Sequence, residues 1–426
     1  MNSSSIQANS GPPARLLPTY ESPTRQPRRT HLGNWPVSMQ YDIIAAMGGI
    51  SRGNLHIAIN AHLLSSQAGY RSAGVHHYIY QLLRHLEPTD SSRYTVLVGE
   101  GEIPPNASLS PLRSRWPTGR APVRVVWEHL VQPWTLHQIN ADLVHEPVFI
   151  GPLFSTCPTV ITIHDLSFIR LPHLFRPANR LYLTVMTRLS ARRARRLIAV
   201  SAHTAAESVK LLGVSMERID VIYHGVDSIF RPLPDDEIEA FRQKRGLPER
   251  FILCVGTLEP RKNHTRLIEA FARIYDGKSK LVLIGGKGWL YDELFAKIEA
   301  LELNKAVIFQ GYVANEDLPL WYNAATVFAY PSLYEGFGMP ILEAQACGTA
   351  VMTSTAPPLP ETAGEAALLA NPHDVEEMAT KLNRLLTDKP LRHELEKRGV
   401  AHAHQFTWTR TAQETAHVYR HALEGD

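Results

Sequence analysis

The chain is predicted to be an α/β protein with two doubly wound domains, each built around a parallel sheet. Three observations favour this fold class. Short apolar runs alternate with helical stretches from residue 55 onward, a second series begins at residue 251, and a non-periodic segment containing Gly and Pro separates them at 222–232. Strands of parallel sheets are buried on both faces and therefore form such continuous apolar runs. With 426 residues, 44% of them hydrophobic, the chain can form two sizeable cores.

The first domain is expected over residues 51–225. Its helix at 75–86 has apolar residues at helical spacing, and a longer helical stretch runs from about 176 to 195. The strands are short apolar runs, at 55–59, 94–98, 123–127, 143–145, 160–163 and 197–200. Their alternation with helices predicts a sheet that is covered on both faces.

The second domain is expected over residues 226–408, followed by a C-terminal helix at 409–426. Its strands are predicted at 251–255, 281–284, 307–309, 327–329 and 350–352. Open parallel sheets bind their ligands outside the carboxyl ends of the strands. Two such domains facing one cleft would therefore hold a ligand between two sheet edges.

Residues 1–50 differ from the rest of the chain in composition. Ser, Asn, Pro and Arg dominate, with a basic run at 25–29. Such a segment has too little apolar surface to offset the entropy of ordering, so we expect a disordered tail. The tail is either a dispensable extension or a basic contact for anionic lipid.

Composition excludes several classes of protein. The formal net charge of +3 gives no sign of a nucleic-acid partner. The three Cys residues are widely spaced among apolar residues, which is typical of buried free thiols in a reducing, cytoplasmic compartment. No apolar run reaches the roughly 18 residues of a membrane helix, and no signal-peptide core is present near the start. The chain has neither a Walker phosphate loop nor a Gly-x-Gly-x-x-Gly turn after its first strand, which argues against ATPases and NAD enzymes.

The most informative segment runs from Glu335 to Glu343 and reads Glu-Gly-Phe-Gly-Met-Pro-Ile-Leu-Glu. Because Pro is favoured at the first position of a helix, a Gly-rich loop is expected to become a helix near Met339. The helix start would offer backbone N–H groups and a positive dipole end to a phosphate. The two carboxylates would bind hydroxyls on either side of that phosphate, which describes a sugar nucleotide. The alternative is an ordinary surface helix with solvated Glu side chains.

This segment resembles the E-x7-E motif of retaining glycosyltransferases with the GT-B fold, most closely glycosyltransferase family 4. The resemblance covers roughly residues 55–425 and implies two Rossmann-like domains, with the C-terminal helix crossing back to the first. It implies that Glu335 contacts hydroxyls of the transferred sugar and that Glu343 holds the ribose. The backbone that lines the diphosphate and the donor sugar would come from Phe337, Gly338 and Met339.

A second candidate lies in the turn Gly-Thr-Leu-Glu-Pro-Arg-Lys-Asn after the strand at 251–255. Arg261 and Lys262 precede a helix start, where cations are unfavourable unless an anion binds there too. They form a candidate diphosphate clamp, with Lys as a point charge and Arg as a planar fork; two solvated cations are the alternative. The turn resembles the family's phosphate-binding turn, and Lys262 matches its lysine. Thr257, a candidate donor-binding residue, stands where many members carry Arg, so Arg261 would supply the second positive charge.

Two further candidates lie in the first domain. Gly74, before the helix at 75–86, matches a family glycine that lies against the donor diphosphate, whereas a second family glycine is His76 in this chain. His164 follows the strand at 160–163 and resembles the family histidine beside the donor sugar. Asp165 would either orient this histidine or bind acceptor hydroxyls.

The resemblance also implies a mechanism. The sugar–phosphate bond loosens, and Arg261, Lys262 and the helix start stabilise the leaving diphosphate. No Asp-x-Asp pair or His/Cys cluster has metal-ligand spacing, so we expect no metal ion and no cofactor besides the sugar nucleotide. The turn at 256–263 is similar to that of bacterial mannosyltransferases of polysaccharide assembly. A GDP-mannose-like donor and a saccharide or lipid-linked acceptor are therefore expected.

A group of Arg residues marks the end of the predicted helix at 176–195. Its members are Arg192, Arg193, Arg195 and Arg196, with Arg176, Arg180 and Arg188 upstream. Anionic lipid attracts such residues by about 1 kcal/mol each near the surface. Cations also suit the negative end of a helix dipole, so a solvated helix end is the alternative. Peripheral contact with the inner membrane face would suit a lipid-linked acceptor.

Two other functions fit the sequence. The first is a sugar-phosphate-forming or phosphorylase-like enzyme of the same fold; phosphorylases of that kind need a pyridoxal lysine, whose absorbance would reveal it. The second is a non-catalytic sugar-nucleotide-binding module, which donor would stabilise without turnover. The presence of both Glu335 and Glu343 argues against the second function.

Overall fold

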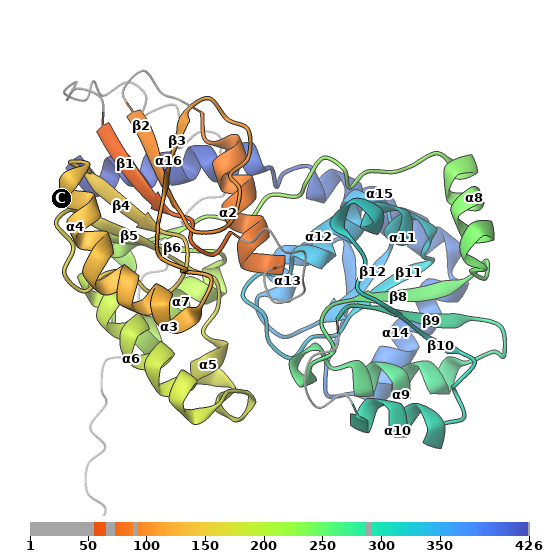
Figure 1. Cartoon of the computed structure of the whole chain (residues 1–426). Coiled ribbons are helices and arrows are strands. Elements are labelled where there is room, and N and C mark those ends of the chain that lie inside the picture. Colours follow the sequence, from red (N-terminus) through yellow and green to blue (C-terminus); the bar gives the residue numbers. More distant parts are fainter. Residues whose placement is uncertain (1–54, 65–72, 88–91, 287–291, 425–426) are drawn as a thin grey trace, which may run out of the picture. The chain divides into compact units, whose positions relative to one another are not determined.

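The structure is a computed structural model that describes residues 55–64, 73–87, 92–286 and 292–424. The expected tail at 1–50 lies outside the described residues, which all belong to one unit, residues 52–426. This unit contains two parallel sheets, each flanked by helices (Figure 1). The predicted α/β class with two doubly wound sheets is thereby confirmed.

The first sheet has seven strands in the order β3-β2-β1-β4-β5-β6-β7. Its strands are β1 (Leu55–Asn60), β2 (Ser92–Val98), β3 (Leu109–Arg113), β4 (Leu143–Glu146), β5 (Thr159–Ile163), β6 (Arg196–Ala199) and β7 (Ile219–Val221). Its helices are α2 (Ala73–His85), α3 (Ala121–Val126), the π-helix η1 (Trp127–Val131), α4 (Gln132–Gln138), α5 (Ser167–Arg170), η2 (Pro172–Leu174), α6 (Pro177–Arg193), α7 (Ala202–Leu212) and η3 (Met216–Arg218). The strand order reverses between β1 and β4, which is where open sheets of this kind bind ligands.

The second sheet has six strands in the order β10-β9-β8-β11-β12-β13. Its strands are β8 (Phe251–Val255), β9 (Lys280–Ile284), β10 (Val307–Gly311), β11 (Val327–Tyr330), β12 (Val351–Ser354) and β13 (Ala367–Ala370). Its helices are α8 (Asp235–Arg245), η4 (Pro260–Lys262), α9 (His264–Ile274), α10 (Asp292–Ala300), η5 (Asn315–Asp317), α11 (Leu318–Ala324), α12 (Met339–Ala346), α13 (Leu359–Ala363), α14 (Val375–Thr387) and α15 (Lys389–Ala403). In this sheet the strand order reverses between β8 and β11, and both strands are followed by candidate site residues.

One strand prediction was wrong. The run at 123–127 is not a strand but the end of α3 and the start of η1, with a Pro in the first turn of α3. Adjacent Val residues favour strands by propensity, but here packing decides, because Trp127 and Leu136 are buried against the sheet in one apolar cluster. The strand next to β2 is instead β3, an exposed edge strand of sequence Leu-Ser-Pro-Leu-Arg whose single buried residue gave little apolar signal.

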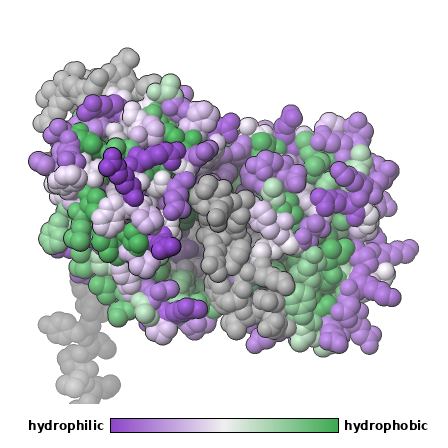
Figure 2. Space-filling view, in the orientation of Figure 1, coloured by the Kyte–Doolittle hydropathy of each residue, from purple (hydrophilic) through white to green (hydrophobic). Residues whose placement is uncertain are grey.

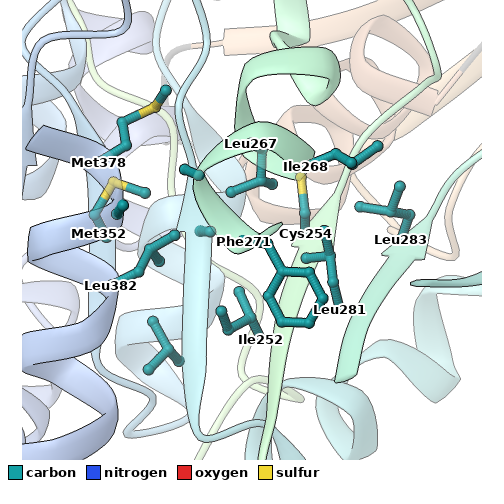
Figure 3. Close-up of a cluster of buried hydrophobic side chains, with 14 of the residues drawn as sticks. Ile252, Cys254, Leu267, Ile268, Phe271, Leu281, Leu283, Met352, Met378 and Leu382 are labelled. Carbon is teal, nitrogen blue, oxygen red and sulfur yellow. The ribbon is translucent and has the colours of Figure 1, made fainter. Parts of the chain in front are cut away.

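Helices α9 and α14 cover one face of the second sheet. Leu267 and Phe271 are fully buried on α9, and Figure 3 shows them directed toward Ile252 and Leu281 of the sheet. Met378 and Leu382 of α14 extend the same cluster. Each such side chain contributes roughly 1.5–3 kcal/mol by its removal from water. This core fixes the strand ends from which the site residues emerge.

The C-terminal helix α16 (Trp408–Glu424) packs on elements of the first sheet. It contacts α2, β5 and β6. The buried Tyr419 hydroxyl lies 2.7 Å from Nδ1 of His145, whose Nε2 lies 2.9 Å from the hydroxyl of Thr162. Just before α16, the N–H of Val226 donates to the carbonyl of Phe406 at 3.0 Å. The chain therefore passes between the two sheets twice, in two neighbouring segments.

From the sequence we expected buried free cysteines and no membrane-spanning helix. All three cysteines are free; two are buried and Cys157 is half-buried, and burial raises the pKa of its thiol to about 11. Among the helices of the described residues, none is long and apolar enough to cross a membrane.

The contact between Tyr419 and His145 gives a stability prediction. Tyr419→Phe should lower the free energy of unfolding by about 1–3 kcal/mol, because a buried imidazole nitrogen loses its partner. Denaturant unfolding measures this. Tyr312→Phe is the matched control, because that side chain is half exposed (52%). Equal stability of the two variants would contradict the docking of α16 through this bond.

Candidate active site

The segment with the two carboxylates connects β11 to α12. As expected, the helix begins at Met339, with a Pro in its first turn. Gly338 precedes the helix with φ +109°, a backbone conformation that a side chain would strain. Glu335 lies in the loop and Glu343 on α12, and both are buried. Such buried carboxylates need partners, and each has a different set.

Glu335 is held by two cations and a phenol. Its Oε1 accepts from Nζ of Lys262 at 2.6 Å and from the hydroxyl of Tyr330 at 3.0 Å. Its Oε2 accepts from Nη1 of Arg261 at 2.7 Å. Burial by itself would raise the pKa of this carboxyl, but Arg261 and Lys262 outweigh burial and lower the pKa to about 2. Glu335 is therefore ionised at every pH at which the protein would work.

The two cations come from the turn after β8, as predicted. Lys262 is buried; burial lowers its pKa, and Glu335 counteracts this by favouring the charged amine. Its Nζ also donates to the hydroxyl of Tyr330 at 2.6 Å. Arg261 forms a second ion pair with Glu259, with Nε and Oε1 2.5 Å apart. The clamp is thus a network of two cations and two carboxylates.

Asn263 fastens this turn to the rest of the second sheet. Its backbone is left-handed, with φ +63°, and it precedes α9. Its side-chain amide donates to the carbonyls of Pro331 and Pro372, at 3.1 and 2.7 Å. The N–H of Leu333 donates to the carbonyl of Arg261 at 2.7 Å. The β8 turn and the β11 loop are therefore locked together before any ligand binds.

Glu343 has a different environment. Its Oε2 accepts from the hydroxyl of Tyr322 at 2.7 Å. Burial raises the pKa of its carboxyl to about 7, with a smaller contribution from Asp227 and an opposing one from the Tyr322 bond. Of the two carboxylates of the motif, one is permanently charged and the other titrates near neutrality.

His164 lies against the motif through the main chain. A Cβ atom at Gly336 would come within 1.7 Å of the carbonyl oxygen of His164, so only glycine permits this approach. The carbonyl of Gly336 accepts from the hydroxyls of Ser201 and Thr204, at 2.7 and 3.1 Å. Residues of the first sheet therefore hold the loop that carries Glu335.

The His164 ring is fixed and neutral. Nε2 lies 2.7 Å from the carbonyl of Pro147, to which it can only donate. Burial lowers the pKa of this histidine, and the ring stacks on His224 with centroids 5.5 Å apart. Asp165 does not bond to the ring in this arrangement; its Oδ1 accepts from the N–H and hydroxyl of Ser167 at 2.9 and 2.7 Å.

The other predicted site residues differ in their burial and contacts. Gly74 is exposed in the first turn of α2, and Thr257 is half-buried after β8. The Phe337 ring is buried and stacks on Tyr223, with centroids 5.8 Å apart. Its carbonyl accepts from the hydroxyl of Thr362 at 2.5 Å. Met339 is half-buried against apolar clusters of both sheets.

Sequence reasoning missed several partners. Glu361 accepts from the N–H of Ala202 at 2.7 Å and from the hydroxyl of Tyr223 at 2.8 Å, so it caps α7 from the second sheet. The hydroxyl of Tyr334 donates to Glu207 at 2.6 Å and accepts from the N–H of Leu166 at 3.0 Å. Adjacency to Glu335 was a signal for Tyr334. The segment with Glu361 resembles a loop near the nucleotide in relatives, but no sequence pattern indicates that Glu361 bonds to the start of α7. In the described part of the chain, no group of three His, Cys, Asp or Glu could hold a metal ion.

Comparison with known proteins agrees with this fold. Residues 235–402 match the family model of glycosyl transferases group 1, and residues 72–229 match that of Glycosyltransferase Family 4. The chain is 33% identical over 294 residues to O-antigen chain mannosyltransferase B of Escherichia coli, covering 68% of this chain and 77% of the relative. It is 31% identical over 227 residues to the serotype-specific mannosyltransferase WbdA of the same organism, covering 52% of this chain but only 28% of that protein.

Solved structures show the same architecture. Sucrose-phosphate synthase of Thermosynechococcus elongatus superposes with a TM-score of 0.72 at 23% identity, covering 88% of this chain and all of that chain. Anabaena HepE in complex with UDP-glucose superposes with a TM-score of 0.68 at 22% identity, covering 86% and 100%. The fold and the comparisons define a glycosyltransferase with the GT-B fold. The chain belongs to the group 1 glycosyl transferases, with a Family 4 N-terminal half.

The raised pKa of Glu343 predicts how stability changes with pH. The unfolded carboxyl titrates near 4.5 and the folded one near 7, so ionisation between these values disfavours the folded state. Relative to Glu343→Gln, the wild type should lose about 3 kcal/mol of unfolding free energy between pH 4.5 and 8. Denaturant unfolding at several pH values measures this difference. A difference that does not change with pH would show that Glu343 titrates normally.

Proposed function

We propose that this protein transfers a hexose, mannose in the first instance, from a nucleoside diphosphate sugar to a saccharide acceptor with retention of anomeric configuration. The observation that carries the proposal is the buried network of Glu335, Arg261 and Lys262, placed beside Gly336 and His164. There, a carboxylate that can bind sugar hydroxyls lies next to two cations that can bind phosphate. Relatives named as mannosyltransferases support the sugar, and they share 31–33% identity with the chain.

Each residue has a role in this proposal. Arg261 and Lys262 bind the diphosphate, and the start of α12 adds backbone N–H groups. Glu335 accepts hydrogen bonds from hydroxyls of the donor sugar, while Glu343 accepts them from the ribose. The neutral His164 ring, fixed by its bond to Pro147, borders the sugar. The HepE complex with UDP-glucose supports a nucleotide sugar as donor.

The reaction needs no separate base. The bond between the anomeric carbon and the phosphate oxygen breaks, and its electron pair leaves with the diphosphate. The acceptor hydroxyl oxygen bonds to the anomeric carbon on the same face, and its proton passes to the departing phosphate oxygen. Negative charge grows on the diphosphate as the bond breaks, so fixed cations stabilise the transition state more than the bound donor.

A transfer assay with product analysis tests this function. Wild-type protein, GDP-mannose and a mannoside acceptor should yield an α-linked product, whose anomeric configuration proton NMR reports. UDP-glucose and dTDP-glucose serve as competing donors. A β-linked product would contradict retention, and turnover of UDP-glucose alone would contradict a mannosyl donor.

The cationic clamp gives a kinetic prediction. Lys262→Ala should lower kcat by roughly 10²–10³, the usual effect of removing one preorganised charge stabiliser. The loss should exceed the loss in donor affinity, because the diphosphate charge grows only as the bond breaks. Steady-state kinetics and calorimetric titration with donor separate the two effects.

The same clamp would replace a metal ion. EDTA should therefore leave wild-type transfer unchanged. Activity that disappears on chelation and returns with Mg²⁺ or Mn²⁺ would overturn the clamp as the charge stabiliser. Equal losses of kcat and of donor affinity in Lys262→Ala would overturn its action in the transition state.

We also propose that the protein works at the cytoplasmic face of a membrane on a lipid-linked acceptor. Val126, Leu130 and Trp134 expose apolar side chains along α3, η1 and α4, and Leu181 and Val185 do so on α6. Figure 2 shows apolar surface in the region where Figure 1 places these helices. Arg180 on α6 is exposed and complements anionic lipid. Arg188 and Arg192 are exposed too, but each donates from Nε to a carbonyl at the end of α7.

Not every Arg of this group is free for lipid. Arg196 is buried and binds Asp220 through two bonds of 2.7 and 2.9 Å. With Arg193 and Arg195 it lines a hollow of about 440 Å³ at the amino ends of β5 and β6, the sheet edge opposite His164. The hollow is therefore a surface feature away from the reaction.

Vesicle binding tests the membrane contact. Leu130→Ser should lose most of its co-sedimentation with phosphatidylglycerol vesicles, because 71% of that side chain is exposed for insertion. Tyr312→Ser, an exposed residue of the second sheet's half, is the control. Equal binding by both variants would overturn the proposed face.

A further inference from the structure

A hollow with basic walls lies at the edge of the first sheet where β5 and β6 begin. Its volume is about 440 Å³, within the range of roughly 300–1,000 Å³ that is typical of small-ligand sites. The loop before β5, the end of α6, the start of β6, η3 and α16 all contribute to its walls. Five Arg residues and one His belong to the lining: Arg192, Arg193, Arg195, Arg196, Arg218 and His421. We call this feature the arginine hollow.

Carboxylates do not balance the positive charge of the arginine hollow. Among the described residues that line it, none is Asp or Glu. Arg196 forms an ion pair with Asp220 of β7, and within the described part of the chain it is the one Arg of the hollow that has a carboxylate at ion-pair distance. Burial and the neighbouring Arg195 and Arg196 lower the pKa of the Arg218 guanidinium. The hollow therefore gathers positive charge that is largely uncompensated.

Part of this set has a structural role at the end of α6. Nη2 of Arg218 donates to the carbonyls of Ala191 and Arg192, at 3.3 and 3.2 Å, and to that of Ala194. Carbonyls at the end of a helix need such donors, and a cation suits the negative end of the helix dipole. Nε of Arg192 donates to the carbonyl of Leu212 at 3.2 Å. Arg218 therefore caps α6, and both guanidinium groups are held in place without a ligand.

Arg193 and Arg195 are not needed for that role. Arg193 is the last residue of α6, and Arg195 lies between α6 and β6. The main-chain N–H of Arg195 donates to the carbonyl of Thr159 at 2.8 Å, which fixes its backbone at the start of β5. Both side chains are exposed, and neither bonds to another described residue. Two cations that are free to bind a ligand therefore lie beside the fixed Arg218.

The chemistry of the lining indicates the class of ligand. Each guanidinium presents N–H donors in one plane, which match the oxygens of a phosphate in pairs. His421 of α16 adds an imidazole that can also donate. Like charges that are held together repel one another, and a bound anion reverses this cost. Because several cations line the hollow, a group with more than one negative charge fits it best.

We propose that the arginine hollow binds the phosphate or diphosphate group of a phosphorylated ligand through Arg193, Arg195 and Arg218. The site goes beyond the proposed function, because it lies at the sheet edge opposite His164 and its ligand is not the sugar donor. A bound phosphate would connect α16, through His421, to α6 and η3 of the first half. The phosphate belongs either to a free compound or to a lipid head group, and the experiment separates these two sources.

Calorimetric titration of the full chain with inorganic pyrophosphate tests the site. GDP at saturation keeps this probe out of the donor clamp. The double variant Arg193→Gln/Arg195→Gln should bind pyrophosphate about tenfold or more weakly than the wild type, because it loses hydrogen bonds between charged groups. The control Arg231→Gln/Lys397→Gln removes the same charge at exposed positions in the half of the chain that forms the second sheet. Its pyrophosphate affinity should equal that of the wild type.

Co-sedimentation with vesicles of phosphatidylcholine and phosphatidic acid identifies the source of the phosphate. If the double variant loses pyrophosphate affinity but binds vesicles as the control does, the ligand is a free phosphorylated compound. Loss of vesicle binding, with or without loss of pyrophosphate affinity, assigns the site to a lipid head group.

Equal binding of both probes by the double variant and the control would overturn the site, as would a wild type that binds neither probe. Loss of pyrophosphate affinity in Lys262→Ala, with none in the double variant, would place the probe at the donor clamp and also overturn the site.

Discussion

The buried ion network around Glu335 is the interaction on which the rest of the candidate site depends. Lys262 is buried deeply enough that its charge would be costly by itself, and Glu335 is the partner that keeps the charged amine favourable. Removing one partner of a buried ion pair typically costs 3–5 kcal/mol, because the other charge is left without compensation. The network therefore fixes two cations at the carboxyl ends of β8 and β11 before a ligand arrives. Preorganised charge of this kind is what a leaving diphosphate requires.

The second constraint is the close approach of the two halves of the chain at Gly336. No side chain fits between this residue and the carbonyl of His164, and Ser201 and Thr204 hold its own carbonyl. Glu361 completes the contact by capping α7. The loop that carries Glu335 is consequently positioned by residues of both sheets. The two cations and the edge of the first sheet are thus coupled through one short loop.

Much of this arrangement could be predicted from the sequence. Buried strands such as β8 and β11 are continuous apolar runs, and the turn chemistry around Met339 marks a helix start. Edge strands were not predictable in the same way, since β3 buries one residue and β7 has three residues in all. The Val-rich run at 123–127 was misassigned because local propensity favours a strand, whereas burial of Trp127 requires the helix.

The residue types of the site could be predicted, but the hydrogen bonds and ion pairs that connect them could not. The motif spacing indicated Glu335 and Glu343, and the turn indicated Arg261 and Lys262. That Glu335 binds both cations depends on how β8 and β11 pair, which no local pattern encodes. The contacts of Glu146 with Asn60 and Gln132 were missed for the same reason, since they depend on the topology of the first sheet.

The central claim is that Glu335 serves the donor sugar while it holds the clamp in place. Replacing Glu335 with Gln has two opposing effects on diphosphate binding. Lys262 carries its positive charge less readily, which weakens binding, and a carboxylate that repels the diphosphate is removed, which strengthens it. The measurement compares the kcat and the GDP affinity of Glu335→Gln with those of the wild type. The account predicts that kcat falls at least about tenfold, because the sugar loses a charged acceptor, while the GDP dissociation constant changes by no more than about threefold, less than 1 kcal/mol. Equal losses in kcat and in GDP affinity would contradict it.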